Sequence, residues 1–434
     1  MDPTLAGIGS IVILIIFLVI GMPVAFAMGI AGFLGFVVYS GPETAFGVLY
    51  NLPYRTLSGW IFIVIPLFIL MGNFAFFSGI TTDLFRAARN WLGRVPGGLG
   101  VATVAAAAGF AAATGAAMAS AAAMSKIAIP EMERYGYQRK LALGTVAIGG
   151  TLAGIIPPSV GLVMYGILTD VSIAKLLIAG ILPGVMIAIL LMIFIILRVI
   201  RNPQMAPTVS GVSWKERFIS LKGVTGIVIL ILFVIGSLYL GLTTPSEAAA
   251  VGAFGAFLII LVSRKLTRSN FTESLFDTGR TTAMIMFIFV GGIIFSRFLI
   301  ITGIPLQLMS LVEGSQMHRL VVLVIVTFVY LILGMFLDQG SITVITVPII
   351  FPIMVALGFD PVWFGVFFAI LTNLGQVTPP VGLVCFVMKG TVPNCTLGEV
   401  FSGVWPFFGV ELVALVIMTA FPQIATFLPA TMMT

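Results

Sequence analysis

The sequence predicts an all-α membrane protein with two inverted repeats, about ten transmembrane helices and two re-entrant helical hairpins. Three observations lead to this fold class: an apolar composition, helix-length apolar segments and an internal repeat. Of the 434 residues, 60% are hydrophobic and 8% are charged, whereas a soluble domain has roughly 25% charged residues. The segments long enough, or nearly so, to cross about 30 Å of hydrocarbon as a helix are 5–20, 61–77, 178–197, 224–240 and 320–336. A soluble enzyme is therefore excluded.

A constant shift of 222 positions aligns the two halves of the chain. The matching positions include Pro23 with Pro245, Pro130 with Pro352, Gly136 with Gly358, and Pro157-Pro158 with Pro379-Pro380. Internal similarity at one fixed offset is the signature of a repeated unit. We therefore predict a first repeat over residues 1–220 and a second repeat over residues 221–434.

Each repeat is predicted to contain membrane helices, one hairpin and one broken helix. In the first repeat the elements are helices 5–20, 23–39 and 60–77, an amphipathic interfacial segment 82–91, a hairpin at about 97–130, a broken helix at about 140–168 and a helix 172–198. The hairpin is predicted because an Ala- and Gly-rich run is interrupted near Thr114-Gly115. The second repeat has a hairpin at about 318–356 and a broken helix at about 362–391. A hairpin that re-enters leaves five crossings per repeat, so the second repeat is inverted, as in many secondary transporters.

The distribution of positive charge predicts the orientation of the chain. With the N-terminus outside, 17 of the 21 Lys and Arg residues lie on the cytoplasmic side, as the positive-inside rule requires. The four exceptions are Arg55, Lys175, Arg297 and Arg319. The first hairpin then opens toward the cytoplasm and the second toward the outside. The net charge of +6 reports this orientation and not nucleic-acid binding.

Each broken helix carries a double proline at the predicted middle of the membrane. The first break is GGTLAGIIPPS, residues 149–159, and the second is TNLGQVTPPVG, residues 372–382. Prolines remove backbone donors and end the helical ladder, and the second break adds hydroxyl and amide oxygens. Oxygen-rich unwound backbone is how such folds coordinate Na+. The alternative to an ion site is that each break is only a kink that serves helix packing. Neither break contains a His or a carboxylate, which disfavours a proton relay.

The predicted hairpin tips, residues 113–120 and 334–341, are rich in small and polar residues. Such residues let the backbone approach an ion or substrate closely. The tip and break residues that we place near the substrate are Ser120, Asp338, Pro158 and Pro380. An acid such as Asp338 is costly between apolar half-helices unless it meets a cation, an Arg or free backbone donors. Its alternative role is to cap the half-helix that follows it.

Other chemically notable residues have simpler predicted roles. Thr244 and Glu247 fit a capping box at the start of a helix, and His318 is expected to be solvated in an outer loop. Glu411 lies deep in the last apolar segment without a local partner and could pair with a helix of another chain. The cysteines, Cys385 and Cys395, have neither a metal-ligand spacing nor a disulfide framework, so no metal site other than an ion site for Na+ is predicted.

The motif stretches 149–159, 244–252, 334–352 and 372–383 closely resemble the large membrane subunit of the TRAP (tripartite ATP-independent periplasmic) transporters, the DctM-like family. The resemblance covers nearly the whole chain. It implies an elevator-type, Na+-coupled uptake carrier in the bacterial or archaeal inner membrane, with no other cofactor. It also implies two partners, a small four-helix membrane subunit and a periplasmic substrate-binding protein. The family's substrates are mostly small organic anions, such as C4-dicarboxylates and sialic acids.

The resemblance also assigns ion-binding roles to individual residues. The first Na+ site would use Thr114, Gly115, Gly150, Ile155 and Pro157. The second Na+ site would use Gly340, Ser341, Asn373, Gln376 and Thr378. The first tip departs from the family's serine-rich pattern, because alanines stand at hydroxyl positions, namely Ala113, Ala116 and Ala117. Side-chain ligation at the first site is therefore less well supported than backbone ligation.

We predict that the hairpins and broken helices form a moving transport domain, because the polar breaks cluster there. The fixed scaffold would be residues 5–39 and 223–263 with the interfacial arms. The main alternative function is a self-sufficient ion-coupled carrier or exchanger of organic anions that needs no binding protein. A membrane enzyme would need a nucleophile, paired acids or metal ligands, and a passive channel fits poorly with two re-entrant hairpins.

Overall fold

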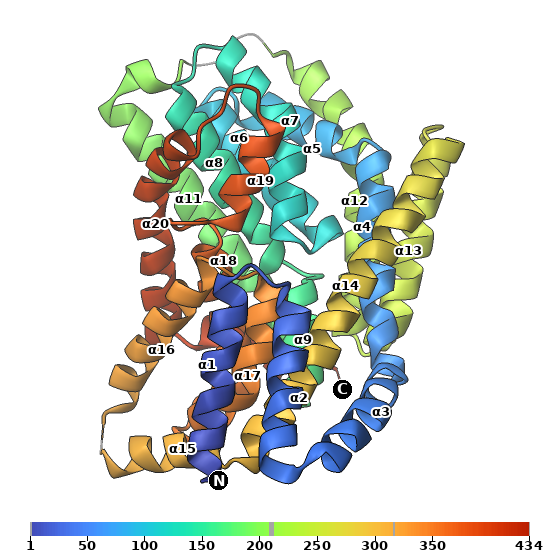
Figure 1. The fold of residues 1–434 in the computed structure, drawn as a ribbon. Coiled ribbons are helices and arrows are strands. Elements are labelled where there is room, and N and C mark those ends of the chain that lie inside the picture. Colours follow the sequence, from blue (N-terminus) through green and yellow to red (C-terminus); the bar gives the residue numbers. More distant parts are fainter. Residues whose placement is uncertain (1, 208–211, 316, 434) are drawn as a thin grey trace.

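The computed structural model describes residues 2–207, 212–315 and 317–433, and these residues form helices and no strands (Figure 1). The fold class is therefore all-α, as predicted. In the first half the elements are α1 (Pro3–Val19), α2 (Val24–Ser40), α3 (Pro42–Leu57), η1 (Trp60–Ile63), α4 (Val64–Phe77), α5 (Ile80–Leu92), α6 (Gly98–Thr114), α7 (Ala117–Arg134), α8 (Arg139–Thr151), η2 (Leu152–Gly154), α9 (Val160–Thr169), α10 (Ile173–Ala179), α11 (Ile181–Arg201) and η3 (Pro203–Met205).

The second half repeats this order of elements. Its helices are α12 (Trp214–Tyr239), α13 (Pro245–Val262), α14 (Arg268–Ile301), α15 (Ile304–Gly314), α16 (Arg319–Gly334), α17 (Gln339–Ala356), α18 (Pro361–Gly375), α19 (Leu383–Thr391), α20 (Leu397–Ala420) and α21 (Gln423–Ala430). α14 runs unbroken for 34 residues where the first half has α3, η1 and α4. α1 begins at the lower end of Figure 1, whereas its counterpart α12 begins near the upper end, so the two halves are inverted.

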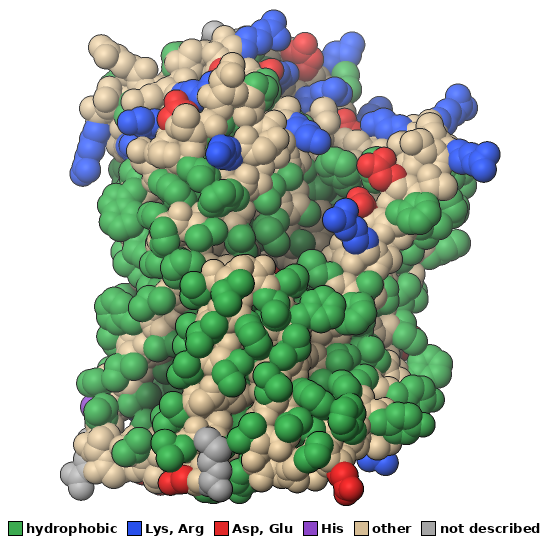
Figure 2. All heavy atoms as spheres, in the orientation of Figure 1, with side chains coloured by type: hydrophobic (Ala, Val, Ile, Leu, Met, Phe, Trp, Pro, Cys, Tyr) green, Lys and Arg blue, Asp and Glu red, His purple; other side chains and the backbone are tan. Residues whose placement is uncertain are grey.

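The surface and the helix lengths fit a lipid bilayer. Within the described ranges, seven helices are long and apolar enough to cross a membrane. Figure 2 shows hydrophobic side chains over the sides of the molecule, while Lys and Arg gather at the end opposite the N-terminus. A broad exposed apolar surface marks contact with lipid or protein, and the excess of basic residues marks the cytoplasmic end. The protein is a multi-pass integral membrane protein.

The first two helices are present but shorter than a full crossing. α1 and α2 have 17 residues each, which gives a helix length of about 25 Å. In Figure 1 they lie in the lower half of the molecule, and the turn between them sits near mid-height. The helices end there because Pro23 cannot continue the hydrogen-bonded ladder of α1. A segment that the sequence left without an element, residues 42–57, forms the additional helix α3.

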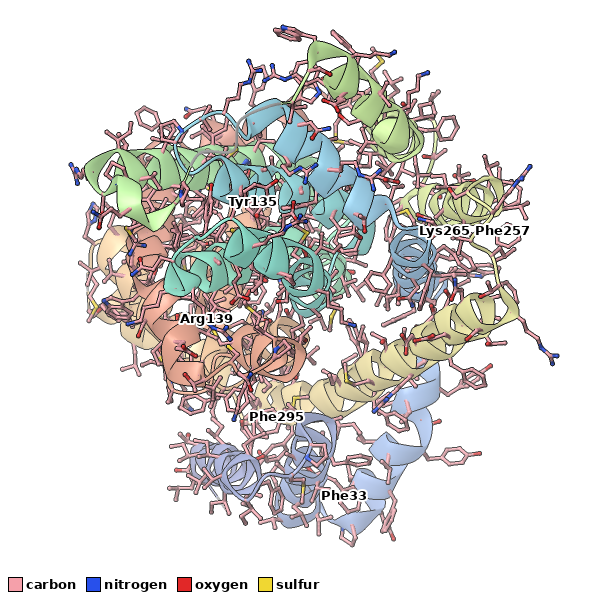
Figure 3. All side chains as sticks on the ribbon, turned by 90° about the horizontal axis from the view of Figure 1, so that it is seen from above. Phe33, Tyr135, Arg139, Phe257, Lys265 and Phe295 are labelled. Atoms are coloured by element: carbon pink, nitrogen blue, oxygen red, sulfur yellow. The ribbon has the colours of Figure 1, made fainter. Side chains whose placement is uncertain are left out.

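Glycines bring the helices of the two halves into backbone contact. A Cβ atom at Gly32 of α2 would stand 2.7 Å from the Cα atom of Phe295 in α14. Gly252 of α13 makes room for a side chain instead, because a Cβ atom there would stand 2.6 Å from the sulfur atom of Met71 in α4. Seen from the Lys- and Arg-rich end, α14 passes between the α1–α3 group and the other helices, with Phe33 and Phe295 on facing elements (Figure 3). Small residues allow such close packing of helices in membranes. The burial of apolar surface alone does little to drive helices together there, because lipid tails are equally apolar.

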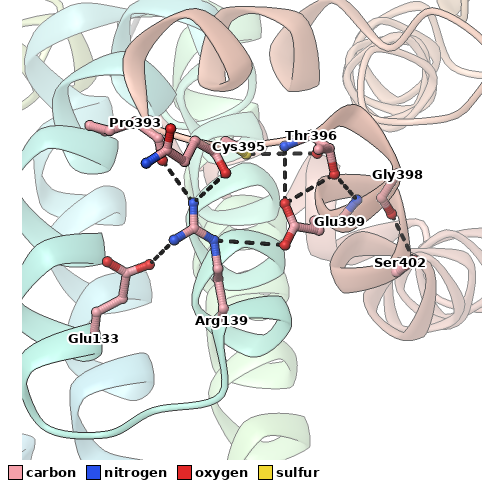
Figure 4. A network of polar contacts seen from close by, with 9 residues as sticks. Glu133, Arg139, Pro393, Cys395, Thr396, Gly398, Glu399 and Ser402 are labelled. Atoms are coloured by element: carbon pink, nitrogen blue, oxygen red, sulfur yellow. Dashed lines mark hydrogen bonds and ion pairs between the residues drawn. The ribbon is translucent and has the colours of Figure 1, made fainter.

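A cluster around Arg139 joins three segments at the cytoplasmic end (Figure 4). The guanidinium group donates to Glu133 Oε1 at 2.8 Å and to the carbonyl oxygens of Pro393 and Asn394 at 2.8 and 3.1 Å. Its Nε atom lies 3.9 Å from Glu399 Oε1. The end of α7, the start of α8 and the loop between α19 and α20 are thereby tied together. The cluster links the base of the first hairpin to the second broken helix.

Candidate substrate and ion site

The first hairpin tip touches the first helix break. α6 ends at Thr114, and Gly115 takes the left-handed conformation at φ 62°. The Gly115 carbonyl oxygen accepts a hydrogen bond from the Val160 N–H at 3.3 Å, and a Cβ atom at Gly115 would overlap the carbonyl oxygen of Pro158. Only glycine fits here, because it tolerates this φ and leaves room for the facing backbone. The structure thus brings Thr114 and Gly115 together with the predicted Pro157-Pro158 break.

The other predicted residues of the first site lie further apart. Gly150 packs on Ala121 of α7, and the Ile155 carbonyl oxygen faces Gly180 at the start of α11. The Thr114 hydroxyl donates to the Phe110 carbonyl oxygen at 3.2 Å, which leaves its oxygen lone pairs available. Ser120 is wholly buried on α7, and its hydroxyl has no hydrogen-bond partner in the described part of the chain. The ion-binding role of this set stays a prediction.

The second tip is organised by Asp338, which caps α17. Its Oδ2 atom accepts from the N–H groups of Gly340 and Ser341 at 2.9 and 3.2 Å, and its Oδ1 atom accepts from the Ser341 hydroxyl. This is the alternative, capping role considered for Asp338. The tip also meets the second break, because the Gly382 N–H donates to the Met335 carbonyl oxygen at 3.1 Å.

The second break supplies several buried oxygen atoms. The Thr378 hydroxyl donates to the Leu374 carbonyl oxygen at 2.7 Å, and the Gln376 amide donates to the Thr372 carbonyl oxygen at 3.4 Å. The Asn373 amide donates to Ala369, but its Oδ1 atom is buried without a partner among the described residues. Asn373 packs directly on Gly154 of the first break, so the two breaks meet in the interior. Pro158 is buried, whereas Pro380 is exposed.

A cavity of about 340 Å³ lies where both tips meet α4 and α14. The predicted residues that line it are Thr114, Gly115, Asp338, Gly340 and Gln376. The other predicted site residues are not part of its lining, and they are Ser120, Gly150, Ile155, Pro157, Pro158, Ser341, Asn373, Thr378 and Pro380. All of these residues except Pro380 are buried.

The cavity also has lining residues that sequence reasoning did not place there. They include Asn73 of α4, Lys126 of α7 and Asp277 of α14. The Asn73 amide donates to Thr278 Oγ1 at 3.0 Å, which links α4 to α14. In the sequence, Lys126 and Asp277 stand only as charges near the ends of apolar segments, and no local pattern assigns them to one cavity.

Three predictions about titratable residues can be compared with the structure. Thr244 and Glu247 form the predicted capping box, and His318 is exposed at the start of α16. The suggestion that Glu411 pairs with another chain needs correction, because it is fully buried and its Oε1 atom lies 3.1 Å from Thr151 Oγ1. Thr151 is 260 positions away in the sequence, so the pair is invisible to local analysis. Across the described residues, no group of three or more His, Cys, Asp or Glu is arranged to hold a metal ion.

Comparison with known proteins agrees with this geometry. Residues 11–424 match the family "Tripartite ATP-independent periplasmic transporter, DctM component". The chain is 34% identical to the C4-dicarboxylate TRAP transporter large permease protein DctM of Pseudomonas aeruginosa, over 93% of both proteins. It is 30% identical to the sialic acid TRAP transporter large permease protein SiaM of Vibrio cholerae, over 94% of this chain and 95% of that one.

A solved structure supports the fold independently. The YdaH transporter of Alcanivorax borkumensis superimposes with a TM-score of 0.64 and 13% identity, over 88% of this chain and 89% of that one. The family match and the two large permeases, which extend over nearly all of the sequence, confirm the resemblance found in the motifs. The chain is therefore a large permease of the DctM family of tripartite ATP-independent periplasmic transporters.

Proposed function

We propose that the protein carries out Na+-coupled secondary active uptake of a small organic anion or related solute across the inner membrane by an elevator mechanism. It receives the substrate from a periplasmic binding protein and works with a small four-helix membrane subunit. The main observation that supports this proposal is the cavity of about 340 Å³ between the two hairpin tips, α4 and α14. The names of its relatives fit this substrate class, since they include C4-dicarboxylate and sialic acid permeases and one for the zwitterion ectoine.

The helix N-termini at the cavity support an anionic substrate, whereas the formal charge of the lining does not, because it includes Asp277 and Asp338 as well as Lys126. The N-terminal residues of α7, α9 and α17 all line the cavity, and helix N-termini attract anions through free N–H groups and the helix dipole. The first turn of α17 is already capped by Asp338, but α7 has no side-chain cap at Ala116. Lys126 of α7 lines the same cavity. The start of α7 therefore offers N–H groups without a side-chain cap, and Lys126 stands further along the same helix, about 14 Å away at 1.5 Å per residue.

The second break supports Na+ as the coupling ion. Hydroxyl and carbonyl oxygens are the ligands that hard cations prefer, and Asn373 Oδ1 and Thr378 Oγ1 are both buried there. Asn373 Oδ1 has no partner within the described chain, so it is available to a cation. The Thr378 hydrogen is committed to Leu374, which leaves the oxygen lone pairs free to bind an ion.

Replacing Thr378 by Val is expected to weaken Na+ dependence. Loss of one oxygen ligand should raise the Na+ concentration for half-maximal uptake about tenfold, since a tenfold change corresponds to ~1.4 kcal/mol. The measurement is uptake by proteoliposomes as a function of Na+. The matched control is Thr419→Val in α20, because the Thr419 hydroxyl makes the same bond to the carbonyl oxygen four residues back. An unchanged Na+ dependence in Thr378→Val would remove this residue from the ion site.

The tripartite function is tested in the same proteoliposomes. This chain is reconstituted with its small subunit, and uptake of a labelled C4-dicarboxylate or sialic acid is measured with and without a Na+ gradient and the binding protein. Uptake that requires both additions supports the proposal. Uptake by this chain alone, without the binding protein, would favour the self-sufficient carrier instead.

The elevator mechanism predicts that a crosslink between hairpin and scaffold stops transport. α4 packs on α13, so we assign it to the scaffold, and Phe76 of α4 lies 6.5 Å from Phe110 of the first hairpin between ring centroids. Cysteines at these two positions, joined by a short bifunctional thiol reagent, should abolish uptake that is present before crosslinking.

The control crosslink joins two helices of the scaffold. The rings of Phe74 in α4 and Phe257 in α13 lie 5.6 Å apart, so the same reagent can link cysteines placed there. Both pairs are built in a background without Cys385 and Cys395. Transport should survive the crosslink within the scaffold. If transport also survives the crosslink between hairpin and scaffold, the hairpin does not move relative to the scaffold and the elevator mechanism is wrong.

A further inference from the structure

Glu411 is a buried acid that the proposed cavity does not use. It lies on α20, is fully buried, and contacts Thr151, which is the last residue of α8 and part of the first break. Its Oε2 atom has no hydrogen-bond partner among the described residues. α20 is held close to α8 because Gly403 packs directly on the backbone of Gly144. The carboxyl group therefore sits in a fixed position beside the first broken helix.

The hydrogen bonds of Thr151 indicate where the proton lies. The Thr151 hydroxyl lies 2.6 Å from the Ile148 carbonyl oxygen and 3.1 Å from Glu411 Oε1. A carbonyl oxygen only accepts, and a threonine hydroxyl has one hydrogen to donate. The hydroxyl is within donating distance of both oxygens, and we assign its hydrogen to the Ile148 carbonyl oxygen because that contact is shorter. The contact with Glu411 is then a hydrogen bond only if the carboxyl group carries a proton and donates it to Thr151 Oγ1.

Among the described residues, the helices packed on α20 place no charge next to Glu411 that would compensate an ionised carboxylate. The helices packed on α20 are α8, α11, α18, α19 and α21, and the charged residues on these helices and on α20 itself, apart from Glu411, are Arg139, Lys140, Arg198, Arg201, Lys389 and Glu399. Arg139 contacts Glu399 at the start of α20. Glu411 lies about 18 Å further along this helix, at 1.5 Å per residue, so Arg139 is too far away to pair with it.

The remaining charged residues lie toward the same cytoplasmic end. Phe194 of α11 pairs with Phe407 of α20, so Arg198 and Arg201 lie beyond Phe407 from Glu411. The only other titratable side chain on these helices is Cys385, whose thiol donates to the Val377 carbonyl oxygen at 3.5 Å. A buried carboxylate without a charged partner and with one bare oxygen is strongly unfavourable, whereas a neutral carboxyl group is not.

We propose that Glu411 is a proton-binding site beside the first helix break, and that its carboxyl group holds a proton which it donates to Thr151 Oγ1. The ligand is a proton exchanged with water, and no other group changes. The site supplies the carboxylate that the sequence of the two breaks lacks. Its effect on transport rests on the proposed function: a change in the charge of Glu411 adds a pH dependence that is separate from the Na+ dependence of the second break.

Infrared difference spectroscopy tests the proton directly, without any transport assay. The probe is the full-length protein in lipid nanodiscs at neutral pH, compared with Glu411→Gln, whose amide keeps the size of the side chain and can donate to Thr151. The wild type should show the carbonyl band of a protonated carboxyl group, with a shift in D2O, and the variant should lack it. Carboxylate bands in its place, above all if they respond to Na+, would overturn the proposal in favour of a bound cation.

A second variant and a control keep the result interpretable. In Thr151→Val the carboxyl group loses its acceptor, so its band should move to higher frequency; an unmoved band would show that the proton is not directed at Thr151. Glu313→Gln, at an exposed position on α15, should remove only a carboxylate band. If the wild-type band is present while Na+-driven uptake fails, the proposed function is wrong and the proton site stands.

Discussion

Replacing Gly115 by Ala is expected to abolish transport while leaving the chain in the membrane. The new methyl group would overlap the Pro158 carbonyl oxygen, and an L-residue in the left-handed conformation costs a further ~1–2 kcal/mol. The facing atom is backbone of the break, so it cannot move aside as a flexible side chain would. The first tip is then displaced from the break. Uptake should fall by about tenfold or more, since a factor of ten corresponds to ~1.4 kcal/mol.

Gly303→Ala is the matched control for this prediction. Gly303, between α14 and α15, also has a positive φ, at 73°, but a Cβ atom there would meet nothing within 4 Å. The control therefore carries the conformational cost without the overlap. Uptake and thermal stability are measured for both variants at equal expression. Equal losses in the two would show that the contact between tip and break is not what transport requires.

Replacing Gly403 by Ala is expected to give a large loss of stability. A Cβ atom at Gly403 would overlap the Lys140 carbonyl oxygen and stand 2.9 Å from the backbone nitrogen of Gly144. All of these neighbours are backbone, so α20 must move away from α8. Overpacking of this kind costs about 1–3 kcal/mol, and it also removes the small-residue contact that brings membrane helices together. The measurement is the thermal unfolding midpoint of purified protein in nanodiscs.

Gly409→Ala on the same helix gives the control for the Gly403 variant. A Cβ atom at Gly409 would meet nothing within 4 Å, and Ala is favoured over Gly in a helix by roughly 0.5–1 kcal/mol. Gly409→Ala should therefore be as stable as the wild type or slightly more stable. A Gly403→Ala protein that unfolds at the wild-type temperature would mean that α8 and α20 are not in backbone contact.

The local features of the fold could be predicted from the sequence because their causes are local. Gly115 interrupts the first hairpin, and the prolines at Pro157-Pro158 and Pro379-Pro380 lie in the unwound segments between η2 and α9 and between α18 and α19. The capping box at Thr244 was equally visible, because its two members are three residues apart. Composition and charge distribution were sufficient for the membrane class and for the positively charged end.

Other features could not be predicted, because they depend on helices that are distant in the sequence. The sequence placed the ion and substrate residues on the tips and breaks, but only the structure showed that Lys126 and Asp277 share a cavity with the tips. Their partners depend on the rotation and position of whole helices, and no periodicity records these. The helix α3 was missed for a different reason: Pro42, Gly47 and Pro53 interrupt its apolar pattern and are typical of turns.

The sequence by itself determined that this chain is a membrane protein of two repeats with two interrupted hairpins and two broken helices. Proline, glycine and apolar run length act within a few residues, so their effects can be derived without a fold. Only the tertiary structure decided that Asn373 packs on Gly154 and that Glu411 lies against Thr151. The physical reason is that a buried polar group is defined by its neighbours in space, and those neighbours come from opposite halves of the chain.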